Sequence, residues 1–321
     1  MERGCFVIVK YAFSRFLRSL VTLLIVTAAV FFMLRLMPEE GYFAESYDKM
    51  TRGQIEAELT RMGLRDPLHV QLSNYLKNTL RGDLGTSNIV RRYVPIVQVI
   101  GPKIPYSVGF GLTTIAISLA LGIPLGMLMA RRKGRLPDSL GSAYVVFVRA
   151  VPAAVCFIFL QLYGSSFLKV PMLFSLSRPL SWILPTVCMA LGPTANYAMW
   201  MRRYMVDELN KDYIKLARAK GMKNSAVMSR HVLRNAFVPM AQLLPASILL
   251  TITGSIYVES LFSIPGMGGL LVTAIQRQDN TLVQALVLIF SCVGIVGLFL
   301  GDILMAIVDP RIKLEKKGGS R

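Results

Sequence analysis

Histidine, cysteine and acidic residues are scarce in this chain, and their scarcity limits its chemistry. The 321 residues include two histidines, His69 and His231, far apart in the sequence. They supply neither a His-Glu-x-x-His site nor a plausible catalytic triad. The four cysteines have no metal-ligand spacing, and three lie inside apolar runs, where they are most simply small buried residues. No Gly-Lys dipeptide occurs, which excludes a P-loop. These absences favour a non-enzymatic protein.

The shortage of acidic residues leaves a chain that is both basic and apolar. Lys and Arg number 36 against 18 Asp and Glu, the net charge is +18, 54% of the residues are hydrophobic and the mean hydropathy is +0.52. A soluble domain does not usually combine these properties. The basic residues fall between apolar runs long enough to span a bilayer. The pattern therefore indicates a membrane protein with basic loops, rather than a nucleic-acid-binding protein.

Six apolar runs approach the roughly 20 residues that a helix needs to cross the hydrocarbon core. They cover residues 16–37, 107–130, 139–163, 180–201, 239–262 and 283–308. The first run is longer than a secretory signal, so we expect an uncleaved helix. Arg149, Pro152, Pro185 and Pro193 interrupt the third and fourth runs. Such breaks must be shielded from lipid, so these two helices are expected to face the bundle interior.

Basic residues cluster in the segments that six spans place on one side of the membrane. These are the start of the chain, the loop 131–135, the segment 202–239 and the tail after residue 310. The positive-inside rule assigns them to the cytoplasm, with both termini. The long segment 38–105 and two shorter loops poor in Lys and Arg then lie outside.

The segment 212–239, DYIKLARAKGMKNSAVMSRHVLRNAFVP, has a helical pattern of its own. Tyr213, Leu216 and Ala217 form one apolar stripe of a short helix. Gly221 suits the position just after the helix, with Lys220 in the last turn. Asn224 or Ser225 is expected to cap a second helix, which leads through Val227, Met228 and Val232 toward Pro239. Two interpretations follow: a basic helix on anionic lipid, or a helix that docks in a groove of a cytoplasmic partner.

At these residues the sequence resembles the coupling segment of the integral-membrane subunits of ATP-binding cassette (ABC) importers of the dipeptide, oligopeptide and nickel type. The matching positions are Asp212, Tyr213, Ala217, Arg218, Ala219, Lys220, Gly221, His231, Arg234, Asn235 and Pro239. RGDLGTS (81–87), VESLFSIPGMGGLL (258–271) and DILMAIVDPRIK (302–313) also match, so the resemblance covers nearly the whole chain. One departure is the arginine pair that the family usually spaces three apart, because Arg202 fits but Met199 holds the earlier place and Arg203 is adjacent.

The resemblance implies an all-α membrane protein with six transmembrane helices, the type I ABC importer transmembrane fold and a cytoplasmic coupling helix. Residues 1–105 would form the first helix and an external segment, 106–312 a five-helix transport core, and 313–321 a cytoplasmic tail. The coupling helix would bind an ATPase through Asp212, Tyr213, Leu216, Ala217, Arg218, Ala219, Lys220 and Gly221. Small Ala217 and Ala219 would permit close approach to that partner.

The implied function is that of a permease subunit, most simply for peptides, with nickel or another small solute as the alternative. The implied partners are a homologous second permease, two cytoplasmic ATPases, an external solute-binding protein and membrane lipid, without nucleic acid. No cofactor is expected in this chain, because ATP and Mg²⁺ would bind the ATPases. The implied location is a bacterial or archaeal plasma membrane.

Polar groups within the runs are candidates for the substrate pathway. They are Arg149, Thr194, Asn196, Thr251, Thr253, Ser255 and Glu259. For the hydroxyl and amide groups the competing interpretation is a hydrogen bond between helices. We expect Glu259 to support the adjacent turn, Asp302 to pair or to orient the tail, and the PGMGGLL run to form a tight turn rather than a phosphate site. A channel or secondary transporter would instead show inverted repeats or midplane ion ligands, and a membrane enzyme a convergent catalytic set.

Overall fold

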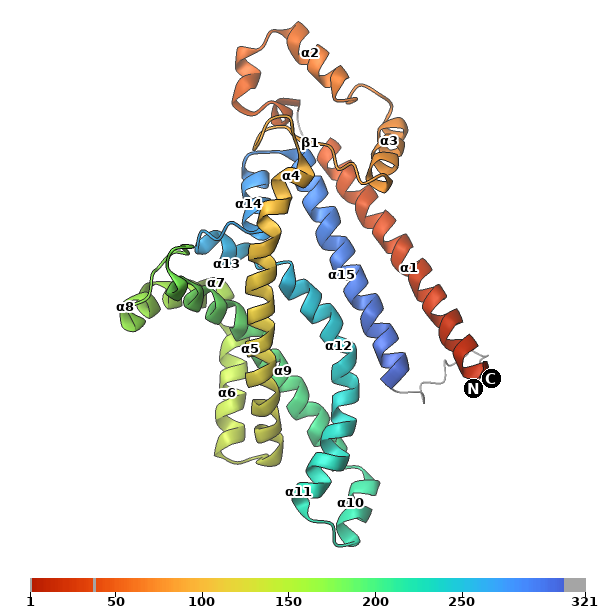
Figure 1. Cartoon of the computed structure of the whole chain (residues 1–321), viewed down its shortest axis with the longest axis vertical. Helices are drawn as coiled ribbons and strands as arrows, with labels where there is room; N and C mark the ends of the chain where they lie inside the picture. Colours follow the sequence, from red (N-terminus) through yellow and green to blue (C-terminus); the bar gives the residue numbers. More distant parts are fainter. Residues whose placement is uncertain (1, 37–38, 309–321) are drawn as a thin grey trace. The chain divides into compact units, whose positions relative to one another are not determined.

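The computed structural model describes residues 2–36 and 39–308 (Figure 1). Most of them are helical, and the strands β1 (Thr86–Ser87) and β2 (Val94–Pro95) form one antiparallel pair. The predicted tail 313–321 and the end of the 302–313 stretch lie outside the described residues. The chain divides into two compact units. Unit 1 comprises Met1–Leu17, Gly109–Ile252 and Gly294–Arg321, and unit 2 comprises Arg18–Val108 and Thr253–Val293.

Unit 2 contains most of the predicted external segment. Its elements are most of α1 (Glu2–Arg35), η1 (Glu39–Tyr42), η2 (Ala44–Lys49), α2 (Arg52–Arg61), α3 (Leu68–Leu80), β1, β2, α4 (Ile96–Ile100), η3 (Gly101–Lys103), the start of α5 (Ile104–Arg131), α13 (Ile256–Leu261), α14 (Met267–Gln276) and the first half of α15 (Asn280–Val308). The apolar face of α4 packs against α14 and the start of α15. A smaller cluster around Tyr42, Phe43 and Leu59 holds the segment next to α2.

Unit 1 contains the remaining helices. They are the rest of α5, α6 (Leu136–Ala150), α7 (Ala153–Phe159), the π-helical η4 (Leu160–Gly164), α8 (Ser165–Leu168), η5 (Pro179–Trp182), α9 (Ile183–Leu209), α10 (Asp212–Ala219), α11 (Asn224–Ala226), the π-helical η6 (Val227–Leu233), α12 (Arg234–Ile252) and the ends of α1 and α15. Near those ends Arg15 pairs with Asp302 at 3.4 Å, which confirms that this aspartate is paired.

Small residues let two pairs of helices in unit 1 approach closely. A Cβ at Gly122 of α5 would lie 2.8 Å from the carbonyl oxygen of Thr194 on α9, and one at Gly126 would lie 2.8 Å from the Cβ of Met201. At Gly297 of α15 it would lie 2.8 Å from the Cα of Ala246 on α12. Without a hydrophobic driving force in lipid, such close backbone packing is a main source of helix association.

Four helices are long and apolar enough to cross a membrane: Phe13–Arg35, Ile96–Arg131, Asn224–Leu261 and Asn280–Leu304. They correspond to the first, second, fifth and sixth predicted spans. The third span, predicted as one run over 139–163, is instead two helices, Leu136–Ala150 and Ala153–Leu168, bent by 104°. The bend occurs because Pro152 forces Val151 into an extended conformation, with φ −83° and ψ 130°.

The fourth predicted span is α9, which is not among the four apolar helices. The expectation that Pro193 interrupts it is wrong, because α9 continues through this residue. Side-chain hydroxyls bond to the turn that precedes Pro193: Tyr144 donates to the carbonyl of Leu191 at 2.9 Å, and Ser118 donates to that of Ala190 at 3.4 Å. The two bonds tie α5 and α6 to α9 next to Pro193.

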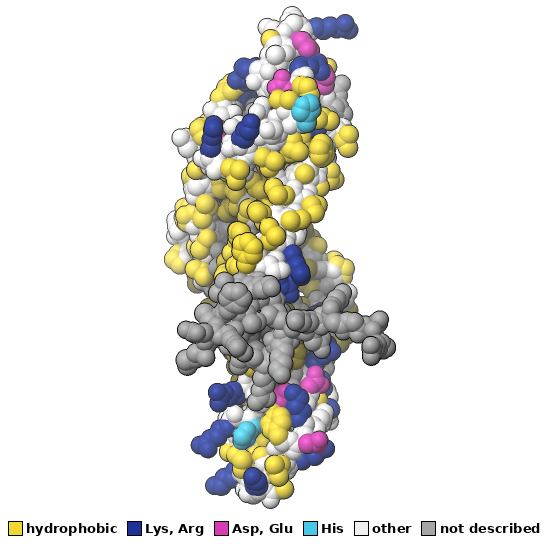
Figure 2. All heavy atoms as spheres, turned by 90° about the vertical axis from the view of Figure 1, so that its right-hand side faces the viewer, with side chains coloured by type: hydrophobic (Ala, Val, Ile, Leu, Met, Phe, Trp, Pro, Cys, Tyr) yellow, Lys and Arg dark blue, Asp and Glu magenta, His cyan; other side chains and the backbone are white. Residues whose placement is uncertain are grey.

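From Phe13 to Leu36, most of the exposed side chains of α1 and the residue after it are apolar. Figure 2 shows hydrophobic side chains over a broad area in the upper half of the face it presents. Phe13, Ile25 and Met33 are 68%, 63% and 69% exposed, respectively. Exposed side chains of this kind along a long apolar helix fit contact with lipid.

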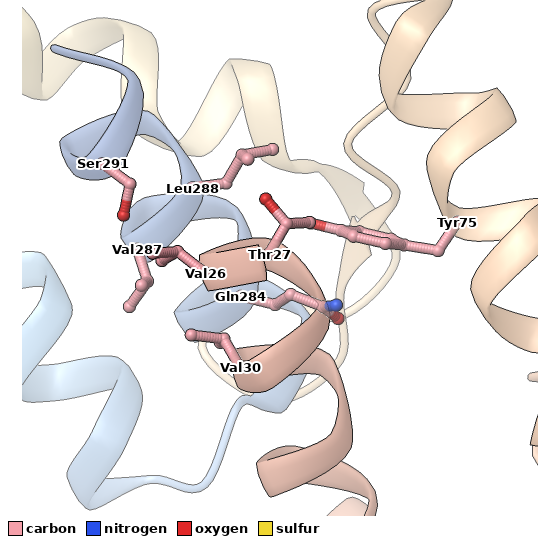
Figure 3. A pocket seen from close by; sticks show the side chains of 8 residues that line it. All are labelled: Val26, Thr27, Val30, Tyr75, Gln284, Val287, Leu288 and Ser291. Carbon is pink, nitrogen blue, oxygen red and sulfur yellow. The ribbon is translucent and has the colours of Figure 1, made fainter. Parts of the chain in front are cut away.

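Within unit 2, helices α1, α3 and α15 enclose a small cavity (Figure 3). Its volume is about 10 Å³, close to what one water molecule needs. Figure 3 shows the Tyr75 ring reaching from α3 toward Thr27 of α1. Gln284 of α15 also lines the cavity, and its amide nitrogen is buried without a hydrogen-bond partner among the described residues.

Candidate functional site

The turn at Gly221 ends α10 as the sequence predicts. Gly221 has φ +80°, the left-handed region that glycine enters without strain. Its N–H donates to the carbonyl of Arg218 at 2.9 Å, and the N–H of Met222 donates to that of Ala217 at 3.3 Å. These two bonds form a Schellman motif, which satisfies the last carbonyls of the helix. Arg218 occupies the last turn and Lys220 is the C-cap residue, one place later than expected.

The buried face of α10 differs from the predicted stripe. Ile214 and Ala217 are buried, whereas Tyr213 is partly exposed and Leu216 is 56% exposed. Ile214 and Ala217 pack against Val227, Met228 and Val232 of the following segment, together with residues of α9 and α12. The stripe prediction fails because the helix packs on its own returning chain. Ala217 is therefore not available to a partner, but Ala219 is exposed.

The returning arm begins at α11 and continues through η6 into α12. Val227, Met228 and Val232 are buried, as expected of a second helix. The predicted cap is wrong, because Lys223 precedes the first helical residue and makes no side-chain capping bond. The returning arm is thus continuous with the apolar span Asn224–Leu261.

A polar network fixes the entry to α10. The buried Glu208 carboxylate accepts hydrogen bonds from Lys211 and from the hydroxyl of Tyr213, which in turn accepts from Asn235 at 2.7 Å. Hydrogen bonding to Glu208 raises the pKa of Lys211. Burial, and then the Glu208 carboxylate, raise the pKa of Tyr213. The network ties α9, α10 and α12 together, so Tyr213 has a structural role within the loop.

The outer face of the loop is strongly basic. Lys215, Arg218, Lys220, Lys223 and Arg230 are exposed. Figure 2 shows Lys and Arg side chains at the end of the molecule that carries α10 and α11. Next to this face lies an open groove, lined by Tyr204, Asp207, Glu208, Lys211, Tyr213, Met222, Ser229, Arg230, His231, Arg234, Asn235, Ala236, Phe237, Val238 and Pro239. The loop therefore combines a buried inner face with an exposed basic outer face.

The structure brings two of the predicted pathway residues together. Arg149 lies in the last turn of α6, and its guanidinium donates to the side-chain oxygen of Asn196 on α9 at 2.8 Å. Both side chains are exposed. Thr194 is buried on the same helix, where α5 approaches at Gly122.

The remaining hydroxyl candidates lie at the end of α12 and the start of α13. Thr251 donates to the carbonyl of Ser247 in its own helix at 2.7 Å. Thr253 and Ser255 flank Gly254 in the break between the two helices, and the Ser255 hydroxyl accepts from the N–H of Val258 at 3.3 Å. These bonds are local, and a contact of these residues with substrate stays a prediction.

Glu259 organises the start of α14. Its buried carboxylate accepts from the N–H groups of Gly268 at 2.7 Å and Gly269 at 3.1 Å, and from the hydroxyl of Ser107 at 2.8 Å. Ser107 in turn accepts from the N–H of Met267. The PGMGGLL run is thus the first turn of a helix, not only a tight turn. An internal carboxylate occupies the helix N-terminus, a position that favours anions.

Two aspartates that the sequence did not single out bond to residues far from them in the chain. Asp138 on α6 accepts two bonds from Arg202 on α9, at 2.5 and 2.8 Å, which gives this arginine a partner within the chain. Asp279 precedes α15 and accepts from Ser87 at 2.5 Å and from the N–H groups of Ile89 and Val90. An aspartate just before a helix is an N-cap signal, which would have identified Asp279 but not its partners. Among the described residues, no group of three or more His, Cys, Asp or Glu side chains could hold a metal ion.

Comparisons with known proteins agree with this architecture. Residues 122–314 match the family "Binding-protein-dependent transport system inner membrane component", and residues 8–90 match its N-terminal membrane component. The dipeptide transport system permease protein DppB of Lactococcus lactis is 32% identical over 306 residues, covering 95% of this chain and all of the relative. The glutathione transport system permease protein GsiC of Salmonella typhimurium is 31% identical, covering 95% of this chain and 99% of the relative.

Solved structures support the same fold. The inward-facing MetNI methionine ABC transporter matches with a TM-score of 0.52 at 13% identity, covering 66% of this chain and 97% of that one. The chain belongs to the family of binding-protein-dependent transport system inner membrane components. It is a multi-pass bacterial membrane protein with the type I ABC importer fold, and it acts as a transport subunit rather than an enzyme.

Proposed function

We propose that this permease subunit carries peptides inward across the membrane and forms one half of the translocation pathway. A homologous second permease completes the pathway, an external solute-binding protein delivers the peptide, and two cytoplasmic ATPases bind ATP and Mg²⁺. Permeases for dipeptides and for glutathione, itself a peptide, align over nearly the whole chain, and this supports a peptide substrate. Nickel or another small solute is the alternative substrate.

The exposed outer face of α10 is the observation that carries the coupling role. Leu216, Ala219 and the basic side chains point away from the packed inner face, while the Gly221 turn and the Glu208 network fix the helix. A helix with this much internal support needs little reordering to bind. Preorganisation of this kind lowers the entropic cost of association. The loop therefore suits docking in an ATPase groove.

Reconstitution tests the proposal. Proteoliposomes with both permeases, both ATPases and the binding protein should transport a radiolabelled dipeptide when ATP is supplied on the side of the membrane that carries the ATPases. This chain alone should hydrolyse no ATP. Uptake of a nickel chelate in place of the dipeptide would favour the alternative substrate, and transport of either solute without ATPases would overturn the coupling role.

A substitution at Leu216 distinguishes docking of α10 in a protein groove from adsorption of α10 on lipid. Leu216→Asp should abolish co-purification of the ATPases, because it places a charge on a surface that must be buried. Ser225→Asp is the matched control, since Ser225 is exposed on the returning arm. Retention of the ATPases by Leu216→Asp would contradict docking through this face.

The proposed orientation places α10 in the cytoplasm and α3 outside. Cysteines at Asn74 and Ser225, both exposed, should report it in a background without the native cysteines. An impermeant maleimide added to intact cells should label the first and not the second. Ser87 is unsuitable for this purpose, because it is buried and bonded to Asp279.

A further inference from the structure

Two ionisable side chains in the transport core face very different surroundings. The Glu259 carboxylate is fully buried and accepts three hydrogen bonds from its own chain. The Arg149 guanidinium is exposed, and its one described bond is to Asn196. Among the described residues Arg149 forms no ion pair, while Arg202 on the facing helix is paired with Asp138. Most of the five N–H donors of Arg149 are therefore available to a ligand.

Arg149 also lies deep along its helix. Helix α6 begins at Leu136, directly after the basic residues 131–135, and Arg149 is in its last turn. At 1.5 Å per residue, Arg149 is about 20 Å from the start of α6. The hydrocarbon core is about 30 Å thick, so a cation at this depth must face protein or water rather than lipid.

The local geometry holds the guanidinium in place. The carbonyl groups at the C-terminus of α6 favour a positive charge there. The 104° bend after Val151 ends the helix directly beyond Arg149, and Asn196 anchors one edge of the guanidinium. A planar group fixed along one edge can present its other N–H groups to a carboxylate, which accepts two parallel hydrogen bonds.

We propose that Arg149, oriented by Asn196, binds a carboxylate of the substrate within the translocation pathway. This inference rests on the proposed function, in which the substrate is a peptide, and it assigns the contact to the carboxylate at the peptide C-terminus. The ligand class is a small organic anion or zwitterion. Arg149 is then a residue that determines specificity, and Asn196 is a positioning residue.

The test compares a dipeptide that has a free carboxylate with the same dipeptide as its C-terminal amide. Uptake is measured in reconstituted transporter with a saturating binding protein. A charge-assisted hydrogen bond is lost with the amide or with Arg149→Gln. Uptake of the amide by the wild type, and uptake of the free acid by Arg149→Gln, should therefore each be about tenfold to a hundredfold lower than uptake of the free acid by the wild type. Arg149→Gln should leave amide uptake unchanged, and Arg149→Lys should restore part of the preference. Arg178→Gln is the control, because Arg178 is an exposed arginine in the loop before η5.

Three results would overturn the proposal. Equal preference for the free acid in the wild type and in Arg149→Gln would show that a residue other than Arg149 recognises the carboxylate. An equal fall in uptake of both peptides, together with loss of the second permease on purification, would assign Arg149 to an ion pair between subunits. Absence of uptake of either peptide by the wild type would instead refute the peptide substrate itself, and with it this inference.

Discussion

Replacing Gly221 with Val isolates the contribution of one backbone turn to coupling. Gly221 has φ +80°, and a Cβ built there has no heavy atom within 4 Å. The Cβ of Val is therefore not crowded by neighbouring residues, and the left-handed backbone is the main source of its effect. A left-handed residue other than glycine costs about 1–2 kcal/mol, and β-branched side chains are at the upper end of that range or beyond it.

The free energy of this backbone strain lowers the affinity of the permease for the ATPase. An ATPase that recognises the native turn must restore it, so about 1–2 kcal/mol lowers its apparent affinity about five- to thirtyfold. Gly221→Asn is the matched variant, because Asn enters the left-handed region readily and should lower the affinity far less. Titration of purified ATPases onto the permease pair in nanodiscs measures the affinity, and ATP hydrolysis and uptake should fall in parallel.

Two outcomes would refute this reasoning. An affinity for Gly221→Val within twofold of the wild type would show that the turn is not recognised. Equal losses for Val and Asn would show that the side chain, rather than the backbone, obstructs the partner. Melting temperature serves as a control, because a change confined to the end of α10 should leave the packing of the apolar helices intact.

Three further changes test the packing. Gly126→Ala should lower the melting temperature in detergent, because the new Cβ meets the backbone of Ala198 on α9. Gly192→Ala is the control, since nothing lies within 4 Å of its Cβ. Equal melting temperatures for the two variants would contradict the close contact between α5 and α9. Asp279→Ala should lower the free energy of unfolding by about 2–4 kcal/mol and speed amide hydrogen exchange in residues 87–90, because it leaves several donors unpaired. Unchanged exchange would contradict the bonds described. Gln284→Leu should raise the melting temperature if its amide is unpaired, and a lower value would indicate that a bound water satisfies it.

The features that were predictable from the sequence are those fixed by neighbouring residues. Four of the predicted spans and the stop at Gly221 depend on composition or on a local helix-ending signal. The coupling role assigned to residues 212–221 also came from a contiguous stretch of sequence, and it stays a prediction.

The errors and omissions involve residues that are distant in sequence. Ile214, outside the predicted stripe, is buried in α10 because the returning arm covers it, and no periodicity within eight residues could reveal that arm's position. The bond between Asp138 and Arg202 joins positions 64 apart, and that between Ser87 and Asp279 joins positions 192 apart. Pro152 and Pro193 gave the same local signal, yet the chain bends after the first helix at Pro152, whereas α9 continues through Pro193.

The Glu259 carboxylate at the start of α14 should also limit which residues occur at nearby positions among relatives. Gly266 has φ −98°, which any residue can adopt, and the atoms nearest to a Cβ built there belong to the Glu259 side chain. Gly254 is different, because φ +91° requires glycine whatever its neighbours are. Among relatives, alanine or serine at position 266 should therefore occur only where position 259 holds a smaller side chain, while position 254 stays glycine in both groups.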